Sequence, residues 1–153
     1  LDIYGNGPMK KELIFYAKKN KINVNFYKNV ENNKLVNIYN KYKFCILLSR
    51  YEGSPKVMLE AMACGCVMIV SKVKGIVGII KQNKNGFYIG SNVNYLKKLI
   101  KDINLQNQIS TNAFNLIKKK YNYLKFLQKE FMIYKKLIWT KLSKELLRKF
   151  FIK

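Results

Sequence analysis

Two carboxylates stand close together in the segment EGSPKVMLEAMACG, residues 52–65. Glu52 comes just before a Ser-Pro pair, and Glu60 follows in an otherwise apolar run. A carboxylate buried without a partner is costly or has a raised pKa, so Glu60 lies either on a narrow solvated stripe or in a cleft beside hydroxyl donors, such as those of a ribose. On the pattern alone, an exposed Glu60 and an ordinary loop acid at Glu52 explain the segment equally well.

The same segment carries the signals that bound a helix at 55–64. Ser54 is a suitable N-cap, Pro55 suits the first helical position, and Gly65 suits the left-handed residue that follows a helix. The amides expected to be free at the helix entrance belong to Gly53, Ser54, Lys56 and Val57. Together with the helix dipole they predict a phosphate site, and an anion there would also offset the unfavourable charge of Lys56.

Strand patterns and helix patterns alternate along the first 90 residues. We expect strands at 1–4, 22–27, 44–49, 67–70 and 87–89, and helices from 9 to 19, around 35–39 and at 55–64, with Pro8 in the first turn of the first helix. The runs at 44–49 and 67–70 are apolar enough to be buried on both faces of a parallel sheet. Further helices are predicted at 93–102, 105–119 and from 123 onward.

This alternation indicates an α/β fold with a doubly wound, Rossmann-like parallel sheet. Such sheets bind ligands at the carboxyl ends of their strands, and the helix at 55–64 begins directly after the strand at 44–49. The chain has 153 residues, 49% of them hydrophobic, which is enough for one compact core. The predicted phosphate site therefore lies at the ligand-binding edge of the sheet.

The net charge of +22 suggests a polyanionic partner, such as nucleic acid, an anionic membrane face or a phosphorylated substrate. Among the 30 cationic residues, only Arg50 and Arg148 are arginines. Arginine is preferred for forked contacts with bases and phosphates, so this composition disfavours nucleic acid.

No metal site is expected, because the chain has no histidine and its three cysteines, Cys45, Cys64 and Cys66, lack a metal-binding spacing. Small buried thiols fit a reducing, cytoplasmic compartment. The sequence shows neither an apolar run of membrane-spanning length nor a signal peptide. The first residues already form a strand pattern without an initiating Met, so we expect a fragment.

Residues 49–71, SRYEGSPKVMLEAMACGCVMIVS, closely resemble the donor-nucleotide motif of the retaining, nucleotide-sugar-dependent glycosyltransferases of family 4. These are two-domain enzymes of the GT-B fold, and their motif is two glutamates separated by seven residues. The motif positions kept are Glu52, Gly53, Pro55, Val57, Leu59, Glu60, Ala61, Met62, Ala63 and Gly65. IYGNGP, KNGFYI and YNYLKFLQKEFMIY resemble further parts of the family's second domain. The resemblance implies a nucleotide-sugar-binding domain at 1–136, incomplete at its N-terminus, followed by a basic amphipathic helix at 137–153.

The resemblance implies the donor-binding half of a hexosyltransferase that transfers a sugar with retention from a UDP-sugar or GDP-sugar to a glycan or lipid-linked acceptor. Glu60 would accept hydrogen bonds from the ribose hydroxyls, and Glu52 would stand near the reacting carbon and stabilise developing positive charge. The backbone of Gly53, Ser54, Pro55, Lys56 and Val57 would hold the diphosphate leaving group. Gly5 and Gly7 would allow close approach of the first loop to the donor. The scheme requires no metal and no other cofactor.

The chain also departs from the family's pattern. Lys72, Val77 and Gly78 stand where the family has an acid, a proline and a glutamate, and Cys66 replaces a further proline. The family's diphosphate-binding Arg and Lys lie ahead of residue 1, as does the N-terminal domain with the acceptor site. We therefore expect this chain to need that missing N-terminal domain for transfer.

Residues 118–153 form a basic, amphipathic stretch with a net charge of +10. Its apolar residues recur at helical spacing: Leu124, Leu127, Phe131, Tyr134, Ile138, Leu142 and Leu146. We expect the stripe at 123–136 to dock on this domain or on the missing N-terminal one, with the lysines as a solvated face. For the remainder, a solvated basic face and a helix on an anionic membrane surface are both open.

Two further functions remain as alternatives. A nucleotide-sugar epimerase or glucan synthase of the same fold would use the same nucleotide site. A non-catalytic basic module for RNA or an anionic membrane would bind polyanions in a salt-sensitive way and be indifferent to Glu52 and Glu60.

Overall fold

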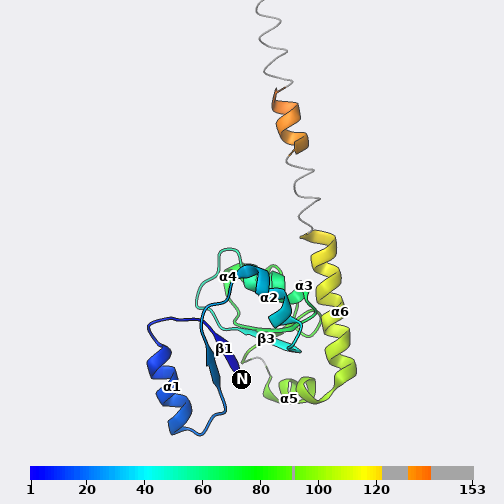
Figure 1. Cartoon of the computed structure of the whole chain (residues 1–153). Helices are drawn as coiled ribbons and strands as arrows, with labels where there is room; N and C mark the ends of the chain where they lie inside the picture. The colour runs from blue at the N-terminus through cyan, green and yellow to red at the C-terminus, as the bar shows by residue number, and fades with distance from the viewer. Residues whose placement is uncertain (91, 122–130, 139–153) are drawn as a thin grey trace, which may run out of the picture.

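The computed structural model describes residues 1–90, 92–121 and 131–138, and it has the expected α/β architecture with parallel strands (Figure 1). The strands are β1 (Asp2–Tyr4), β2 (Asn25–Tyr27), β3 (Phe44–Leu47), β4 (Val67–Val70) and β5 (Phe87–Tyr88). The helices are α1 (Lys10–Lys19), α2 (Asn32–Tyr39), α3 (Lys56–Ala63), α4 (Lys74–Val77), α5 (Val93–Lys101) and α6 (Ile103–Lys120). Residues 131–138 are also helical.

The strands form two sheets. β1 pairs with β2, and a second sheet has the order β3-β4-β5. All pairs are parallel, with Ile3 opposite Phe26 and Cys45 opposite Met68. The predicted alternation of strands and helices is thus confirmed, but within the described residues the sheet is interrupted between β1 and β3.

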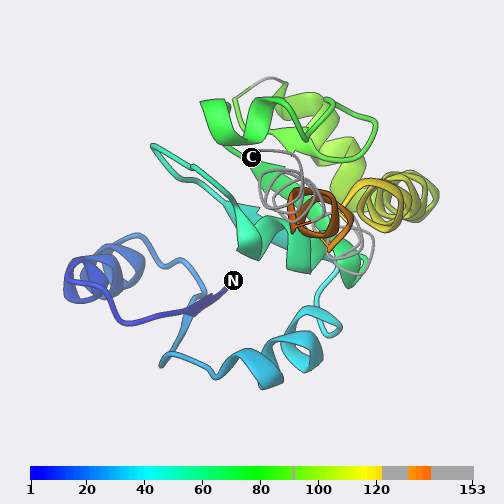
Figure 2. The same cartoon turned by 90° about the horizontal axis from the view of Figure 1, so that it is seen from above.

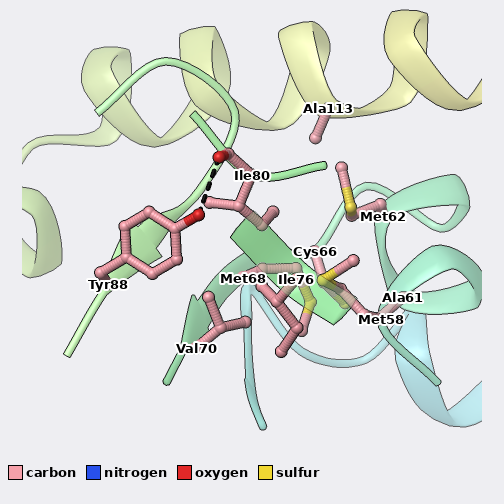
Figure 3. Packing of buried hydrophobic residues seen from close by; sticks show 10 residues of the cluster. All are labelled: Met58, Ala61, Met62, Cys66, Met68, Val70, Ile76, Ile80, Tyr88 and Ala113. Atoms are coloured by element: carbon pink, nitrogen blue, oxygen red, sulfur yellow. Dashed lines mark hydrogen bonds between the residues drawn. The ribbon is translucent and has the colours of Figure 1, made fainter. Parts of the chain in front are cut away.

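β4 is the centre of the core, as its sequence without polar residues predicts. Met68 and Val70 on one face pack in a cluster with α3, α4 and Ala113 of α6, shown in Figure 3. In the same cluster the hydroxyl of Tyr88 donates to the carbonyl oxygen of Ile80 at 2.9 Å. The other face of β4 packs in a second cluster, whose buried members are Val67, Ile69, Phe87, Leu99 and Ile109. Because side chains alternate along a strand, the four residues of β4 supply both clusters.

The prediction that the strand at 44–49 is buried on both faces is wrong in this structure. Cys45 and Leu47 pack against the first cluster, but the Ile46 and Leu48 side chains are 46% and 57% exposed. β3 lies at the edge of its sheet, so these side chains lack the neighbours that a central strand would have.

β1, β2 and α1 lie at one end of the molecule (Figures 1 and 2). α1 begins at Lys10, and the Lys10 amide donates to the carbonyl oxygen of Gly7 at 3.1 Å. Pro8 is therefore the second residue of a turn that precedes the helix. The prediction that Pro8 lies in the first turn of the helix is wrong.

The Tyr42 side chain connects this end to the sheet of β3. Its hydroxyl donates to the Asp2 carboxylate and forms a 2.9 Å hydrogen bond with the hydroxyl of Tyr4. The Tyr4 ring in turn stacks on the ring of Tyr27, with centroids 4.7 Å apart.

The helix at 131–138, orange in Figure 1, does not dock its apolar stripe on the domain. Phe131 and Tyr134 are both more than half exposed, so the expectation that this part of 123–136 docks on this domain is wrong, whereas docking on the missing N-terminal domain stays a prediction. The rest of that stripe lies outside the described residues, as does most of the predicted helix at 137–153. None of the helices in the described ranges combines the length and apolar character needed to cross a bilayer.

Candidate functional site

The entrance of α3 is formed by a tight turn at Pro55. Pro55 has φ −78° and ψ 73°, the conformation of an inverse γ-turn, and the Lys56 amide donates to the carbonyl oxygen of Ser54 at 2.8 Å. Ser54 is therefore not the N-cap; Pro55 occupies that position, and α3 has no side-chain cap. The prediction of a free Lys56 amide is also wrong, because the γ-turn uses it.

The other amides predicted at this entrance remain available. Among the described residues, the backbone N–H groups of Gly53, Ser54 and Val57 donate no hydrogen bond. They lie at the positive end of the α3 dipole, which favours an anion. At the opposite end, Gly65 has φ +81°, so the predicted left-handed residue after the helix is confirmed.

Glu52 is half-buried and held in place by residues at the carboxyl ends of two strands. The Ser49 hydroxyl, after β3, donates to Oε1 of Glu52 at 2.6 Å. The Ser71 hydroxyl, after β4, donates to the carbonyl oxygen of Ser49 at 2.5 Å. Since Ser71 fixes the segment that carries Ser49, the carboxylate of Glu52 is tied to the sheet edge.

α4 approaches the backbone of Glu52 closely at Gly75. A Cβ atom built on Gly75 would lie 2.0 Å from the carbonyl oxygen of Glu52. Any residue other than glycine would therefore clash with the Glu52 backbone at this position. Sequence reasoning missed Gly75, Ser49 and Ser71 as supports of this site. The available signal was position, because Ser49 ends a predicted parallel strand and Ser71 and Gly75 follow another, at the edge where ligands bind.

Glu60 lies on the exposed side of α3, facing α2. Its Oε2 accepts a 3.4 Å hydrogen bond from the hydroxyl of Tyr39, the last residue of α2. Burial and the nearby Glu60 carboxylate raise the pKa of Tyr39, so the phenol remains a donor at neutral pH. Of the two sequence interpretations, the structure supports the solvated one. Among the described residues, Tyr39 is the one weak hydrogen-bond partner of the Glu60 carboxylate, which leaves lone pairs for a further donor.

Cationic side chains surround this edge of the sheet. Arg50, Lys56, Lys72 and Lys74 are all exposed and belong to the loops and helix starts that follow β3 and β4. None of these four cations forms an ion pair within the described ranges, where Lys34 pairs with Glu31 instead. The site therefore combines unpaired amides with positive charge, an environment suited to a diphosphate.

Gly5 and Gly7 are not joined to the loop of Glu52 by any hydrogen bond among the described residues. Gly5 has φ +152°, which favours glycine, and its amide donates to the carbonyl oxygen of Tyr27 at 3.3 Å. A Cβ on Gly7 would meet open space. The backbone conformation of residue 5 thus explains why a glycine stands there. A role of Gly5 or Gly7 at the sugar donor stays a prediction.

The cysteines provide no metal centre in the described part of the chain, where no three potential ligands gather. Burial raises the pKa of the Cys45 and Cys66 thiols to about 11. Cys66 also donates to the carbonyl oxygens of Tyr39 and Tyr42, at 3.3 and 3.4 Å. These thiols are neutral packing groups at physiological pH.

Known proteins resemble this chain in sequence and in fold. The chain is 32% identical over 117 residues to a galactosaminyltransferase of Campylobacter jejuni, named for transfer to a GalNAc-containing saccharide on undecaprenol; the match covers 72% of this chain and 32% of that protein. The structure resembles sucrose-phosphate synthase of Thermosynechococcus elongatus, with a TM-score of 0.78 and 19% identity, covering 92% of this chain and 39% of that one.

It also resembles HepE of Anabaena in complex with UDP-glucose, with a TM-score of 0.70 and 18% identity, covering 84% of this chain and 38% of HepE. The chain thus spans about a third of the length of these proteins. The sequence pattern described as glycosyl transferases group 1 matches residues 1–116. The chain belongs to the group 1 glycosyl transferase family.

Proposed function

We propose that this chain is the donor-binding half of a glycosyltransferase that transfers a hexosyl group, with retention, from a UDP-sugar or GDP-sugar. The observation that carries the proposal is the loop at 52–57. There Glu52, fixed by Ser49 and packed against Gly75, directly precedes the unpaired amides at the entrance of α3. A carboxylate beside an anion site suits a reaction in which positive charge develops on a sugar while a diphosphate leaves.

Each part of the site has one role in this proposal. The amides of Gly53, Ser54 and Val57 bind the diphosphate, and the surrounding lysines lower its charge. Glu52 lies by the donor sugar and stabilises the developing positive charge. Glu60 accepts hydrogen bonds from the ribose hydroxyls through the lone pairs that Tyr39 leaves free. No metal ion is required, because the amides and lysines supply the counter-charge.

The experiment is titration calorimetry of the 153-residue chain with UDP, GDP and inorganic pyrophosphate. The Glu60→Gln variant removes the charge of the proposed ribose acceptor, and Glu31→Gln, an exposed glutamate at the start of α2, is the matched control. Hydrogen bonds to a charged group contribute about 1.5–3 kcal/mol, so Glu60→Gln should weaken nucleoside diphosphate binding by about tenfold or more.

Pyrophosphate lacks the ribose, so its affinity should be the same in the wild type and in Glu60→Gln. Equal UDP affinity in the wild type and Glu60→Gln would refute the ribose role. Equal, strongly salt-dependent binding of UDP, pyrophosphate and unrelated RNA would instead indicate the basic-module alternative.

We further propose that the acceptor is a glycan or a lipid-linked glycan at the cytoplasmic face of a membrane. The support is the polyprenol-linked saccharide in the name of the Campylobacter relative, together with the exposed apolar residues of the helix at 131–138. Flotation with phosphatidylglycerol and phosphatidylcholine vesicles tests the membrane contact. Binding to the anionic vesicles should fall in a Phe131→Ser, Ile138→Ser double variant, and binding unchanged by it would contradict the proposal.

A further inference from the structure

The Glu60 carboxylate has few contacts that could fix its position. Glu60 is exposed on α3, which packs beside α2 (Figure 1). Within the described ranges, the carboxylate has no ion pair and no hydrogen bond besides the one from Tyr39. An exposed glutamate side chain populates several rotamers, so its carboxylate occupies any one position for only part of the time. A site that uses this carboxylate in one position therefore needs a group that selects its rotamer.

Tyr39, the last residue of α2, is by contrast held at both its backbone and its ring. Its carbonyl oxygen accepts from the amide of Tyr42 at 3.0 Å and from Sγ of Cys66 at 3.3 Å. Cys66 is fully buried directly before β4, so this second bond joins the end of α2 to the central strand. The half-buried ring of Tyr39 packs against the first cluster. The position of the Tyr39 hydroxyl is therefore determined by the core.

The hydrogen bond between the two side chains has a definite direction. The hydroxyl of Tyr39 donates to Oε2 of Glu60 at 3.4 Å. Burial, and then the Glu60 charge, raise the pKa of Tyr39, so the phenol keeps its proton at neutral pH, and an ionised carboxylate can only accept. Because the bond is long and weak, it biases the rotamers of Glu60 while Oε1 remains open to a ligand.

We propose that Tyr39 is a positioning residue for the ribose of the nucleotide donor: its hydroxyl holds Oε2 of Glu60 towards α2, which leaves Oε1 for the ribose hydroxyls. This inference rests on the ribose role of Glu60 in the proposed function and adds the residue that directs the carboxylate. Since the buried thiol of Cys66 anchors the Tyr39 carbonyl, the position of the carboxylate is tied through α2 to the central strand. Tyr39 acts on the nucleotide only through Glu60.

The first measurement is made by NMR on the 153-residue chain without a nucleotide. Three-bond couplings of Glu60 report the populations of its χ1 rotamers. In Tyr39→Phe, which keeps the ring but removes the donor, these couplings should shift towards rotamer-averaged values. Tyr95→Phe is the matched control, because Tyr95 is also half-buried and its ring also packs, on Phe87, but its hydroxyl forms no hydrogen bond among the described residues. In the control the Glu60 couplings should be unchanged.

The second measurement is titration calorimetry with UDP and GDP, with their 2′,3′-dideoxy analogues and with pyrophosphate. Tyr39→Phe should weaken binding of UDP or GDP about threefold to tenfold, because Glu60 then loses rotamer freedom when the ribose binds. Binding of the dideoxy analogues and of pyrophosphate should be unchanged, since they lack the ribose hydroxyls, whereas a general structural disturbance would weaken all of these ligands. The loss should also be absent in a Glu60→Ala background, where no carboxylate is left to position.

Two results would overturn the positioning role while the proposed function stands. One is that the Glu60 couplings are the same in Tyr39→Phe and in the wild type. The other is a nucleotide affinity that falls in Glu60→Ala but not in Tyr39→Phe. If Glu60→Ala binds UDP and GDP as tightly as the wild type does, the ribose role of Glu60 fails, and the positioning role of Tyr39 fails with it.

Discussion

Replacing Gly75 by alanine, which adds one methyl group, should lower the stability of the fold and displace the loop that carries Glu52. In Gly75→Ala the new Cβ would lie 2.0 Å from the carbonyl oxygen of Glu52 and 2.7 Å from its carbonyl carbon. Real Cβ atoms essentially never come closer than 3.0 Å, so α4 and the Glu52 loop must separate by about 1 Å. Both contacts are backbone atoms, which cannot move aside as a flexible side chain would.

Overpacking of this kind costs about 1–3 kcal/mol of folding free energy. The midpoint of urea unfolding, followed by circular dichroism, should therefore fall, with an unchanged slope of the transition. Gly78→Ala is the matched control, because it lies at the end of the same helix with φ −76° and no atom within 4 Å of its built Cβ. Its effect should be within about 1 kcal/mol and can be stabilising, since alanine restricts the unfolded chain.

The reasoning fails if the two variants have the same stability. It also fails if Gly75→Ala is stable but a crystal structure shows Glu52 still bonded to Ser49 with the loop unmoved. In that case the close approach would not position Glu52.

Three other predictions concern titration and packing. Hydrogen bonds from Tyr42 and then Asn25 lower the pKa of the Asp2 carboxyl from its ordinary value of 3.8. Its stabilising contribution is therefore present above that pH and is lost as the pH falls through the lowered value. In Asp2→Asn the free energy of unfolding should fall less steeply in acid, and an unchanged fall would contradict this. Burial raises the pKa of the Cys45 thiol from 9.0 to about 11, so stability should decline as the pH rises between these values, and less steeply in Cys45→Ala. Leu99→Ala, at a fully buried site, should cost about 2–5 kcal/mol, against about 0.5 kcal/mol or less for Leu48→Ala; similar losses for both would contradict the described packing.

The sequence was sufficient for elements whose signals are local. β4 has four apolar residues and no polar one, and it proves to be the fully buried central strand. The helix at 55–64 was predicted to within one residue at each end, because Pro55 and Gly65 have backbone preferences of their own. The two-glutamate motif likewise depends on spacing along the chain, and the family it indicated is confirmed.

The structure decided the features that depend on residues far apart in the chain. The apolar run at 44–49 predicts that Ile46 is buried, but Ile46 is half exposed because β3 lies at the edge of its sheet. Likewise, the exposure of Glu60 depends on how α2 approaches α3, and the need for glycine at 75 depends on the backbone of residue 52. Local preferences select helix or strand residue by residue, whereas neighbours across the sheet are set by packing between distant segments. The sequence by itself therefore determined the elements and the family, and only the tertiary structure decided which edges and side chains remain uncovered.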